Sequence, residues 1–366
     1  MLKTTVLAAV VAVAVSAADY RVLAPTAQDN LTVFPIVSDT AHKTDIFLTL
    51  DEGIRSGQVV VTEMGNGGLV RPRRHAVTFP DPWPGPGSPM PIPGAPPPPP
   101  QSSGAEVNRL MLVNNSDRPL ILLAGEIVTG GKQDRIVGRD RIVAPHSDPI
   151  DLSVFCVEPH RWVAQSEKFG AAQAMMAQPS VRQKAMAAKD QHQVWDEVAR
   201  SRAAVVAAAP PAAAGALAGT SSYAQTMQNS TVAQRVDVVA APVERSWEKA
   251  IGELRAHKAV GAVVAVNGEI VWADIFASPA LLEKYWPKLV RSYAADAVSS
   301  RGYNKPASEQ DAQAFLDNFR AQRQNVESEP AVYRNTEIAG DGFDAFVLTS
   351  LLPGADFNVH IAKMKD

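Results

Sequence analysis

The sequence predicts an α+β fold, with an antiparallel β-rich N-terminal part and a helical and mixed α/β C-terminal part. Short apolar runs bounded by turn residues recur as far as Glu158, as expected for an antiparallel sheet. In the second half, four apolar residues recur at helical spacing: Val243, Trp247, Ile251 and Leu254. Three strand-like runs then close the chain, and together these patterns exclude an all-α or all-β protein.

Length and composition indicate a globular protein. The chain has 366 residues, of which 46% are hydrophobic and 20% are charged. This length suits two core units or one large unit with insertions, because domains usually contain about 100–200 residues. The formal net charge is −3, and no block of lysine and arginine is present. We therefore expect no nucleic-acid partner.

Residues 1–18 have the pattern of a signal peptide. Lys3 supplies a positive charge, residues 6–15 form a short apolar core, and Ser16-Ala17-Ala18 offers small residues for cleavage. The apolar run is shorter than the ~20 residues of a transmembrane helix, although an uncleaved anchor remains the alternative. We expect an exported protein, periplasmic or extracellular, without a transmembrane segment once the leader is removed.

The first elements after the leader are two strands with a helix between them. Residues 31–37 and 58–63 have strand character, and residues 50–56 form a helix that ends at Gly57, a helix-stop residue. Residues 79–104 are dominated by proline, which cannot join a sheet ladder. We expect a proline-rich loop inserted into one α+β domain made of residues 19–78 and 105–366. The loop is either a solvated excursion or a binding site for a protein partner.

The middle of the chain changes from strands to helices. Residues 107–114 resume as a strand, and a β-rich block continues to Glu158. Ser180 and Gln183 have capping-box spacing, which predicts one long helix from Ser180 to about Val206. The Ala/Pro/Gly-rich residues 207–219 are expected to form a loop.

The C-terminal half supplies clear start and turn signals. Asn267-Gly268 predicts a hairpin over residues 262–275. Ser278-Pro279 predicts a helix start, and Pro287 should kink or restart that helix. The remaining elements are expected to be a helix over 309–322 and strands over 332–338, 343–348 and 357–362.

The most informative stretch is residues 119–137. Glu126 lies on the strand face of apolar residues, so its carboxyl group should be buried, where it either needs a partner or takes up a proton. If Gly130-Gly131 forms a two-residue hairpin turn, Glu126 lies opposite Arg135. We therefore predict a Glu126–Arg135 ion pair on one face of the hairpin.

The glycines around this hairpin indicate an anion site. Gly125, Gly130 and Gly131 leave backbone amides accessible, and Lys132 and Gln133 add donors suited to phosphate or carboxylate groups. The alternative is a structural turn in which the glycines serve backbone geometry and the ion pair only sets the register.

A second cluster surrounds the end of a strand at Pro159. Cys156 and His160 could form a nucleophile pair, although a lone cysteine in an apolar run is also a normal core residue. Glu158 and Arg161 bring charge against Trp162 and form either a ligand site or an ordinary salt bridge. Glu63 likewise closes an apolar strand, either as a site residue or as a solvated strand end. The histidines lack zinc-site spacing, and no motif identifies a cofactor.

Two runs carry a family resemblance: LLAGEIVTGGKQDR at residues 122–135 and VFCVEPHRW at residues 154–162. They resemble the ADP-ribosylglycohydrolase and rhodanese-phosphatase-associated protein domain family. Thr62-Glu63, Asn114 and the hairpin from Asn267 to Phe276 also fit this family's pattern. The resemblance covers most of the chain after the leader.

The resemblance implies an α+β domain with a Gly-Glu motif and a role in processing NAD-derived or ADP-ribose-like compounds. The site residues carried over are Glu63, Glu126, Lys132, Gln133, Arg135, Glu158 and Arg161. The proline-rich segment departs from the family pattern as an insertion. The leader also departs from it, because NAD chemistry is mostly cytosolic.

Three hypotheses of function follow. The first is an enzyme in which Lys132, Arg135 and Arg161 hold a phosphate or sugar-nucleotide ligand. Glu63, Glu126 or Glu158 would then act as general acid or base. The second is a non-catalytic module that binds a small anionic ligand in the same pocket, and the third is a structural cell-envelope protein.

Overall fold

The computed structural model describes residues 20–63, 109–159, 166, 168–170, 175–300, 302 and 306–366. The leader at 1–18, the proline-rich segment at 79–104 and the predicted site residues His160, Arg161 and Trp162 lie outside these residues. The described part has an α+β fold, as the sequence predicts.

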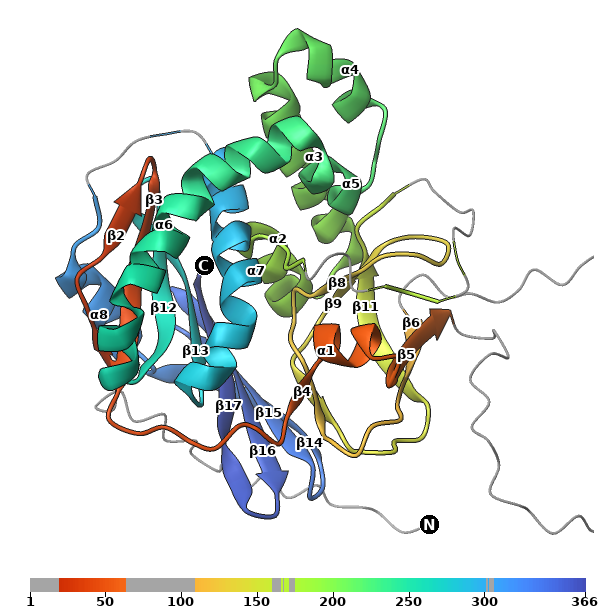
Figure 1. The fold of residues 1–366 in the computed structure, drawn as a ribbon, viewed down its shortest axis with the longest axis vertical. Helices are drawn as coiled ribbons and strands as arrows, with labels where there is room; N and C mark the ends of the chain where they lie inside the picture. Colours follow the sequence, from red (N-terminus) through yellow and green to blue (C-terminus); the bar gives the residue numbers. More distant parts are fainter. Residues whose placement is uncertain are drawn as a thin grey trace, which may run out of the picture.

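A nine-stranded antiparallel sheet forms the larger half of the molecule (Figure 1). Its order is β1-β3-β12-β13-β17-β16-β15-β14, with β2 added to β3. The strands are β1 (Tyr20–Val22), β2 (Thr26–Gln28), β3 (Leu31–Ser38), β12 (Ala259–Val266), β13 (Glu269–Phe276), β14 (Ala321–Glu329), β15 (Tyr333–Gly340), β16 (Phe343–Leu352) and β17 (Ala355–Lys365). The predicted hairpin at Asn267-Gly268 and the closing antiparallel strands are confirmed.

Helices cover both faces of this sheet. The helices α6 (Ser230–Ala256) and α7 (Pro279–Ser299) pack together over β12 and β13 (Figure 1), and α8 (Glu309–Asp317) packs on the opposite face. Each face has its own core, because side chains alternate along the strands: Trp272 and Phe276 face α7, whereas Ala273 and Ile275 face α8. The strands are therefore buried on both sides.

Two smaller sheets are built mainly from the β-rich N-terminal block. One has the order β5-β6-β11-β9-β8, and the other has the order β10-β7-β4, with β4 parallel to β7. The strands are β4 (Leu48–Thr49), β5 (Val59–Glu63), β6 (Arg109–Asn114), β7 (Leu120–Leu122), β8 (Ile127–Val128), β9 (Arg135–Val137), β10 (Arg141–Val143) and β11 (Ile150–Cys156). Further helices connect the strands: α1 (Leu50–Arg55), α2 (Pro179–Gln183), the π-helical η2 (Lys184–Ala188), α3 (Gln191–Ala208), α4 (Pro211–Ala218) and α5 (Tyr223–Gln228).

The single long helix predicted from Ser180 is wrong. The first helix already begins at Pro179, so Ser180 lies inside it and does not cap it. Lys189 adopts the left-handed conformation with φ of 51°, which breaks the helix. α3 starts anew after Asp190, whose side chain accepts a hydrogen bond from the Gln193 amide.

Two further sequence predictions need correction. Residues 207–219 are not a loop, because α4 forms there, with a proline in its first turn and alanines after it. The last helix ends at Asp317, and part of its predicted range belongs to β14, whose backbone pairs with β15. Of the two outcomes expected at Pro287, a kink or a restart, the restart is excluded, because α7 runs as one helix from Pro279 to Ser299 with Pro287 inside it.

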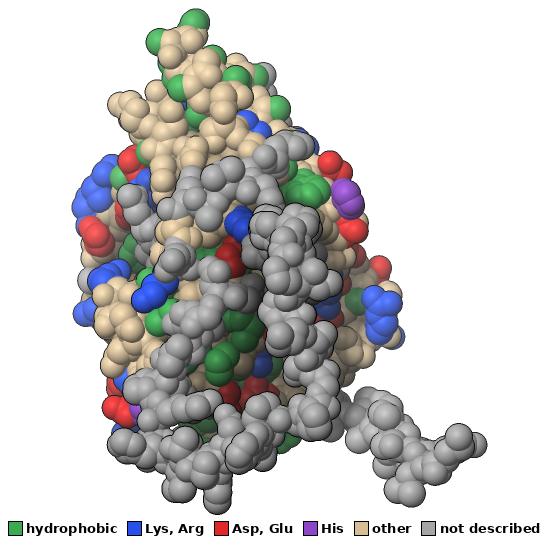
Figure 2. Space-filling view, turned by 90° about the vertical axis from the view of Figure 1, so that its right-hand side faces the viewer, with side chains coloured by type: hydrophobic (Ala, Val, Ile, Leu, Met, Phe, Trp, Pro, Cys, Tyr) green, Lys and Arg blue, Asp and Glu red, His purple; other side chains and the backbone are tan. Residues whose placement is uncertain are grey.

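Charge is mixed over the face that lies on the right of Figure 1. Figure 2 shows basic and acidic side chains interspersed on this face, with the uncharged helix α4 projecting at the top. Within the described part of the chain, no helix is long and apolar enough to cross a membrane.

Candidate functional site

Three buried groups converge on the Gly-Glu motif that the sequence singles out. The Ala124 amide donates to Asp140 Oδ1 at 2.7 Å, and Glu126 binds Lys288. Gly125 has a φ of +98°, and a Cβ on it would lie 2.6 Å from Cγ of Arg182. Glycine is therefore required here by the backbone conformation and by the arginine packed against it. The motif is a junction between the small sheets and the helices.

Glu126 is buried and partnered, as predicted, but its partner is Lys288 of α7. Glu126 is 1% exposed, and its Oε1 lies 2.6 Å from the Lys288 ammonium. Its Oε2 accepts a hydrogen bond of 2.8 Å from the Leu123 amide. Lys288 also binds Asp51, and its ammonium lies 4.5 Å from the ring centre of Tyr285. We call Asp51, Glu126 and Lys288 the lysine centre.

The lysine centre holds two carboxylates against one ammonium. Burial raises the pKa of Glu126, and the neighbouring Asp51 adds to this, so that the opposing effect of Lys288 is outweighed. Burial alone would lower the pKa of Lys288, but Glu126 and Asp51 raise it overall. Lys288 is therefore the charge that persists, and Glu126 is the group that can take up a proton.

The predicted Glu126–Arg135 pairing is wrong because the hairpin register differs. Ile127 pairs with Ile136 and Val128 with Arg135, so the connection consists of residues 129–134. Thr129 forms an isolated β-bridge with Gly170 and does not pair with Lys132. The chain therefore does not reverse direction in a two-residue turn at Gly130-Gly131. Arg135 is fully buried, and its Nη2 lies 4.0 Å from Glu63 Oε1.

Three amides of this glycine loop, residues 129–134, donate to the protein's own carboxylates. The Gly130 amide donates to Asp134 Oδ1 at 3.2 Å and the Lys132 amide to Glu63 Oε1 at 2.8 Å. The Asp134 amide donates to Glu158 Oε2 at 3.1 Å. These three amides thus already have acceptors, which is the arrangement of a structural turn.

The predicted site residues are nevertheless close together. Glu63 and Glu158 are 4% and 3% exposed, so neither is a solvated strand end. Gln133 Nε2 donates to the Glu158 carbonyl at 3.0 Å. Phe169 packs against Gly131, where a Cβ would lie 2.3 Å from its ring.

Cys156 belongs to the core. It is fully buried, and burial raises the pKa of its thiol. Its Sγ accepts a hydrogen bond of 3.3 Å from the Glu158 amide. A thiol in this state is a poor nucleophile.

A cavity of about 160 Å³ lies beside the lysine centre, and we call it the helix cavity. Its walls come from α5, α6 and α7 and from the segment before α2; the residues used below are Met175, Met176, Met227, Tyr223, Lys288, Arg291 and Ser292. None of its described lining residues carries a carboxylate. Through Lys288, Glu126 is one hydrogen bond away from this cavity.

Sequence reasoning missed Lys288, although a signal exists. Leu281, Tyr285, Lys288 and Ser292 follow each other at helical spacing and all are buried, so the lysine interrupts an apolar stripe. A lysine in such a position needs an acidic partner.

A buried histidine network was missed in the same way. His360 Nδ1 lies 2.5 Å from Asp140, and its Nε2 lies 3.1 Å from Asp274. Asp274 also accepts hydrogen bonds from Arg182 and from the Tyr293 hydroxyl. Asp274 and His360 interrupt apolar strands, which is the pattern that marks a buried charge.

No curated protein and no solved structure matches the chain. Residues 19–362 match the family described as the ARG and Rhodanese-Phosphatase-superfamily-associated Protein domain. Because the match covers nearly the whole chain, the protein belongs to this family.

Proposed function

We propose that the protein binds a small anionic organic molecule in the helix cavity. The observation that supports this proposal is that Lys288 lines the cavity, together with Arg291 as the other charged residue among the described lining residues. The pKa of Glu126 is raised by burial, so an arriving anion favours the protonated form of this carboxyl group. The charge of Lys288 is then shared between Asp51 and the ligand.

The size and walls of the cavity define the ligand further. A cavity of about 150 Å³ holds a molecule the size of benzene, so about 160 Å³ accepts one ring with a phosphate or carboxylate group at its edge. Three methionines supply adaptable apolar contacts for that ring. The side chain of Arg291 is 44% exposed, so a longer molecule such as ADP-ribose would extend past it towards solvent.

A catalytic role on phosphate-bearing or ADP-ribose-like compounds is the second candidate. It is supported by the raised pKa of Glu126 and its bond of 2.6 Å to Lys288. Glu126 does not line the cavity, so it would act through Lys288 as a positioning and proton-holding residue. If Glu126→Gln folds and binds the ligand but loses turnover, catalysis is favoured. If the native chain binds the ligand without any turnover, a binding module is favoured.

We also propose that the protein is exported. The pattern of residues 1–18 supports this, and the family match begins at residue 19. N-terminal sequencing of the protein from its native host tests the proposal. A mature chain that begins near residue 19 is expected, and an intact Met1 in a cytoplasmic fraction would contradict it.

Ligand binding is tested by thermal shift with inorganic phosphate, ribose 5-phosphate, AMP and ADP-ribose. A ligand at about 100 times its Kd stabilises the native state by about 2.7 kcal/mol. We expect a shift for the native chain, and a smaller one for Lys288→Met and for Arg291→Gln. Lys284→Met is the matched control, because Lys284 lies one turn earlier on α7 and binds Glu52 on the surface.

Arg291→Gln keeps this test decisive if Lys288→Met folds poorly. Arg291 is half exposed and binds Asp237 at the surface, so its loss should leave the core intact. Equal shifts in the native chain, Lys288→Met and Arg291→Gln would place the ligand elsewhere. The absence of any shift across the probes would contradict anion binding.

A further inference from the structure

The strand β14 forms one end of the nine-stranded sheet and has an open edge. Within the described residues its backbone pairs with β15 alone. The stretch from Arg323 to Glu329 pairs with β15 in regular register, and the one register shift lies before it, between Ala321 and Arg323. The amide and carbonyl groups of alternate residues in this stretch therefore point away from the sheet. A regular edge of this kind is a template for a further strand.

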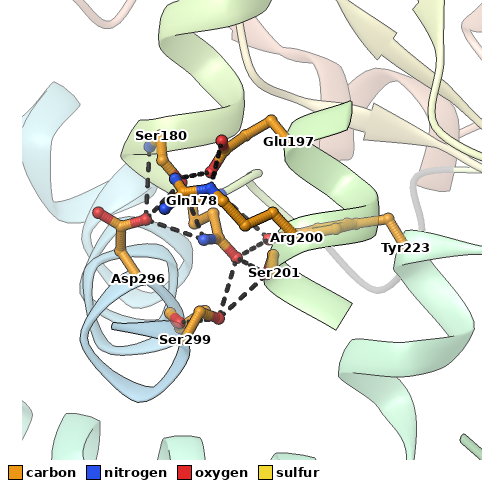
Figure 3. Close-up of polar contacts among 9 residues, drawn as sticks. Gln178, Ser180, Glu197, Arg200, Ser201, Tyr223, Asp296 and Ser299 are labelled. Carbon is orange, nitrogen blue, oxygen red and sulfur yellow. Dashed lines mark hydrogen bonds and ion pairs between the residues drawn. The ribbon is translucent and has the colours of Figure 1, made fainter. Parts of the chain in front are cut away.

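Helices cover the centre of the sheet but leave β14 accessible. α7, which packs over β12 and β13, is fastened to α2 and α3 by buried polar contacts (Figure 3). Gln178 Nε2 at the start of α2 donates to Asp296 of α7 at 2.8 Å, and Gln178 Oε1 accepts a hydrogen bond of 2.8 Å from Ser201 of α3. In contrast, none of the nine residues of β14 is buried. A second strand can therefore approach β14 without displacing a described helix.

β14 carries an exposed apolar side chain near its middle. Val326 is 48% exposed. The other large apolar residues exposed in the described part of the chain are Ile46 and Val238, and neither lies in a strand. A β-branched side chain in a strand is stabilised by a neighbour directly opposite on a paired strand. If a second copy of β14 pairs antiparallel about a two-fold axis at Val326, the two valines lie opposite each other.

The charges of β14 match the same register. Counted outwards from Val326, Arg323 lies three residues before the axis and Glu329 three residues after it, so each faces the other across the axis. Arg323 forms no ion pair within the described residues. Glu329 binds Arg141 through Oε2 at 3.2 Å, which leaves its Oε1 for a second donor. Antiparallel self-pairing thus brings opposite charges together at both ends of the paired stretch.

We propose that β14 pairs antiparallel with β14 of a second copy of this chain, about a two-fold axis at Val326, so that the two large sheets become one. A two-fold interface repeats each contact, so the pair between Arg323 and Glu329 forms twice. Asn325 also lies opposite Glu327 of the second copy and has an amide group that can donate to its carboxylate. The partner is a second copy because the strand is complementary to itself.

Sedimentation velocity over a concentration series tests the dimer. We expect the native chain to change from monomer to dimer as its concentration rises. Val326→Lys should weaken the dimer about tenfold or more, because it places two like charges directly opposite each other. Val238→Lys is the matched control, because Val238 is 58% exposed and lies on α6, and this variant should dimerise as the native chain does. A native chain that stays monomeric throughout, or a dimer that Val326→Lys leaves unchanged, overturns the proposal.

Mixing two charge-reversed variants tests the register. Arg323→Glu alone places two carboxylates opposite each other, and Glu329→Arg alone places two guanidinium groups opposite each other, so each variant should dimerise about tenfold or more weakly. An equimolar mixture restores opposite charges at both positions, and we expect a heterodimer in native mass spectrometry. A mixture that forms no heterodimer overturns this register.

Hydrogen exchange locates the interface without any substitution. The outward amides of residues 321–329 should exchange more slowly in the dimer than in the monomer, because they gain acceptors. Slower exchange confined to other segments would place the interface elsewhere and overturn the proposal. The charge-reversed positions are exposed or half-buried, so both variants should fold, which circular dichroism checks. If either variant does not fold, the exchange measurement on the native chain still decides the question.

Discussion

Arg182 and Asp274, which lie 92 positions apart in the chain, are joined by two hydrogen bonds of 2.9 Å each. Both residues are buried, and Asp274 also accepts a hydrogen bond of 2.6 Å from Tyr293. Burial would raise the pKa of Asp274, but Arg182 and His360 hold it well below its usual range. This pair fastens α2 to β13 of the large sheet.

Removing one partner of this pair should strongly destabilise the fold. Arg182→Leu leaves the Asp274 carboxylate buried without its guanidinium, and such a loss costs about 3–5 kcal/mol. Urea denaturation measures the effect. Arg255→Leu removes a partner from the exposed Arg255–Glu283 pair and should change the free energy of unfolding far less. Equal effects of the two substitutions would contradict a structural role for the buried pair.

Stability should fall with rising pH because of His360. Burial alone would lower the pKa of His360, but the carboxylates of Asp140 and Asp274 raise it to about 9. The folded ring therefore keeps its proton in a range where the unfolded ring, with a pKa of about 6.5, loses it. This contribution is complete below pH ~6.5 and is lost as the pH rises through about 9. Between pH 6 and 10 the free energy of unfolding of His360→Gln should rise relative to that of the native chain, and a difference between the two that does not change with pH would contradict the assignment.

Lys363 should act in the opposite direction. Burial lowers its pKa from 10.5 to about 7, although its ammonium donates to the carbonyls of Phe315 and Asn318. Between these two pH values the unfolded chain binds more protons than the folded one, so this residue makes stability rise with pH. Lys363→Met should remove the rise, since methionine fills similar space without a charge. A pH profile of Lys363→Met that matches the native chain would disprove the shift.

Alanine at Gly125 should be far less tolerated than alanine at Gly57. Both glycines have positive φ, +98° and +72°, so alanine is strained at either position. No atom lies within 4 Å of a Cβ at Gly57, whereas a Cβ at Gly125 meets Arg182 at 2.6 Å. We expect a loss of about 1–2 kcal/mol for Gly57→Ala and a larger loss for Gly125→Ala, measured by denaturation. Equal losses would show that backbone conformation alone requires Gly125.

The sequence by itself determined the elements whose signals are local. Asn267-Gly268 predicted a hairpin because a tight turn needs residues that accept positive φ. Ser278-Pro279 predicted a helix start because the serine side chain can accept a hydrogen bond from an amide of the first turn, and proline has no amide hydrogen that needs an acceptor there. It also predicted that Glu126 is buried, and that a carboxyl group among apolar residues must either bind a partner or take up a proton.

Only the tertiary structure decided which partner Glu126 has. The bridge from Thr129 to Gly170 shifts the register away from Arg135, and α7 brings Lys288 from 162 positions further along the chain. The histidine network was equally out of reach, because Asp140, Asp274 and His360 meet only when β13, β17 and the connection between β9 and β10 are packed together. Partners of buried charges are chosen by distance in space, whereas a sequence pattern reports only which residues need a partner.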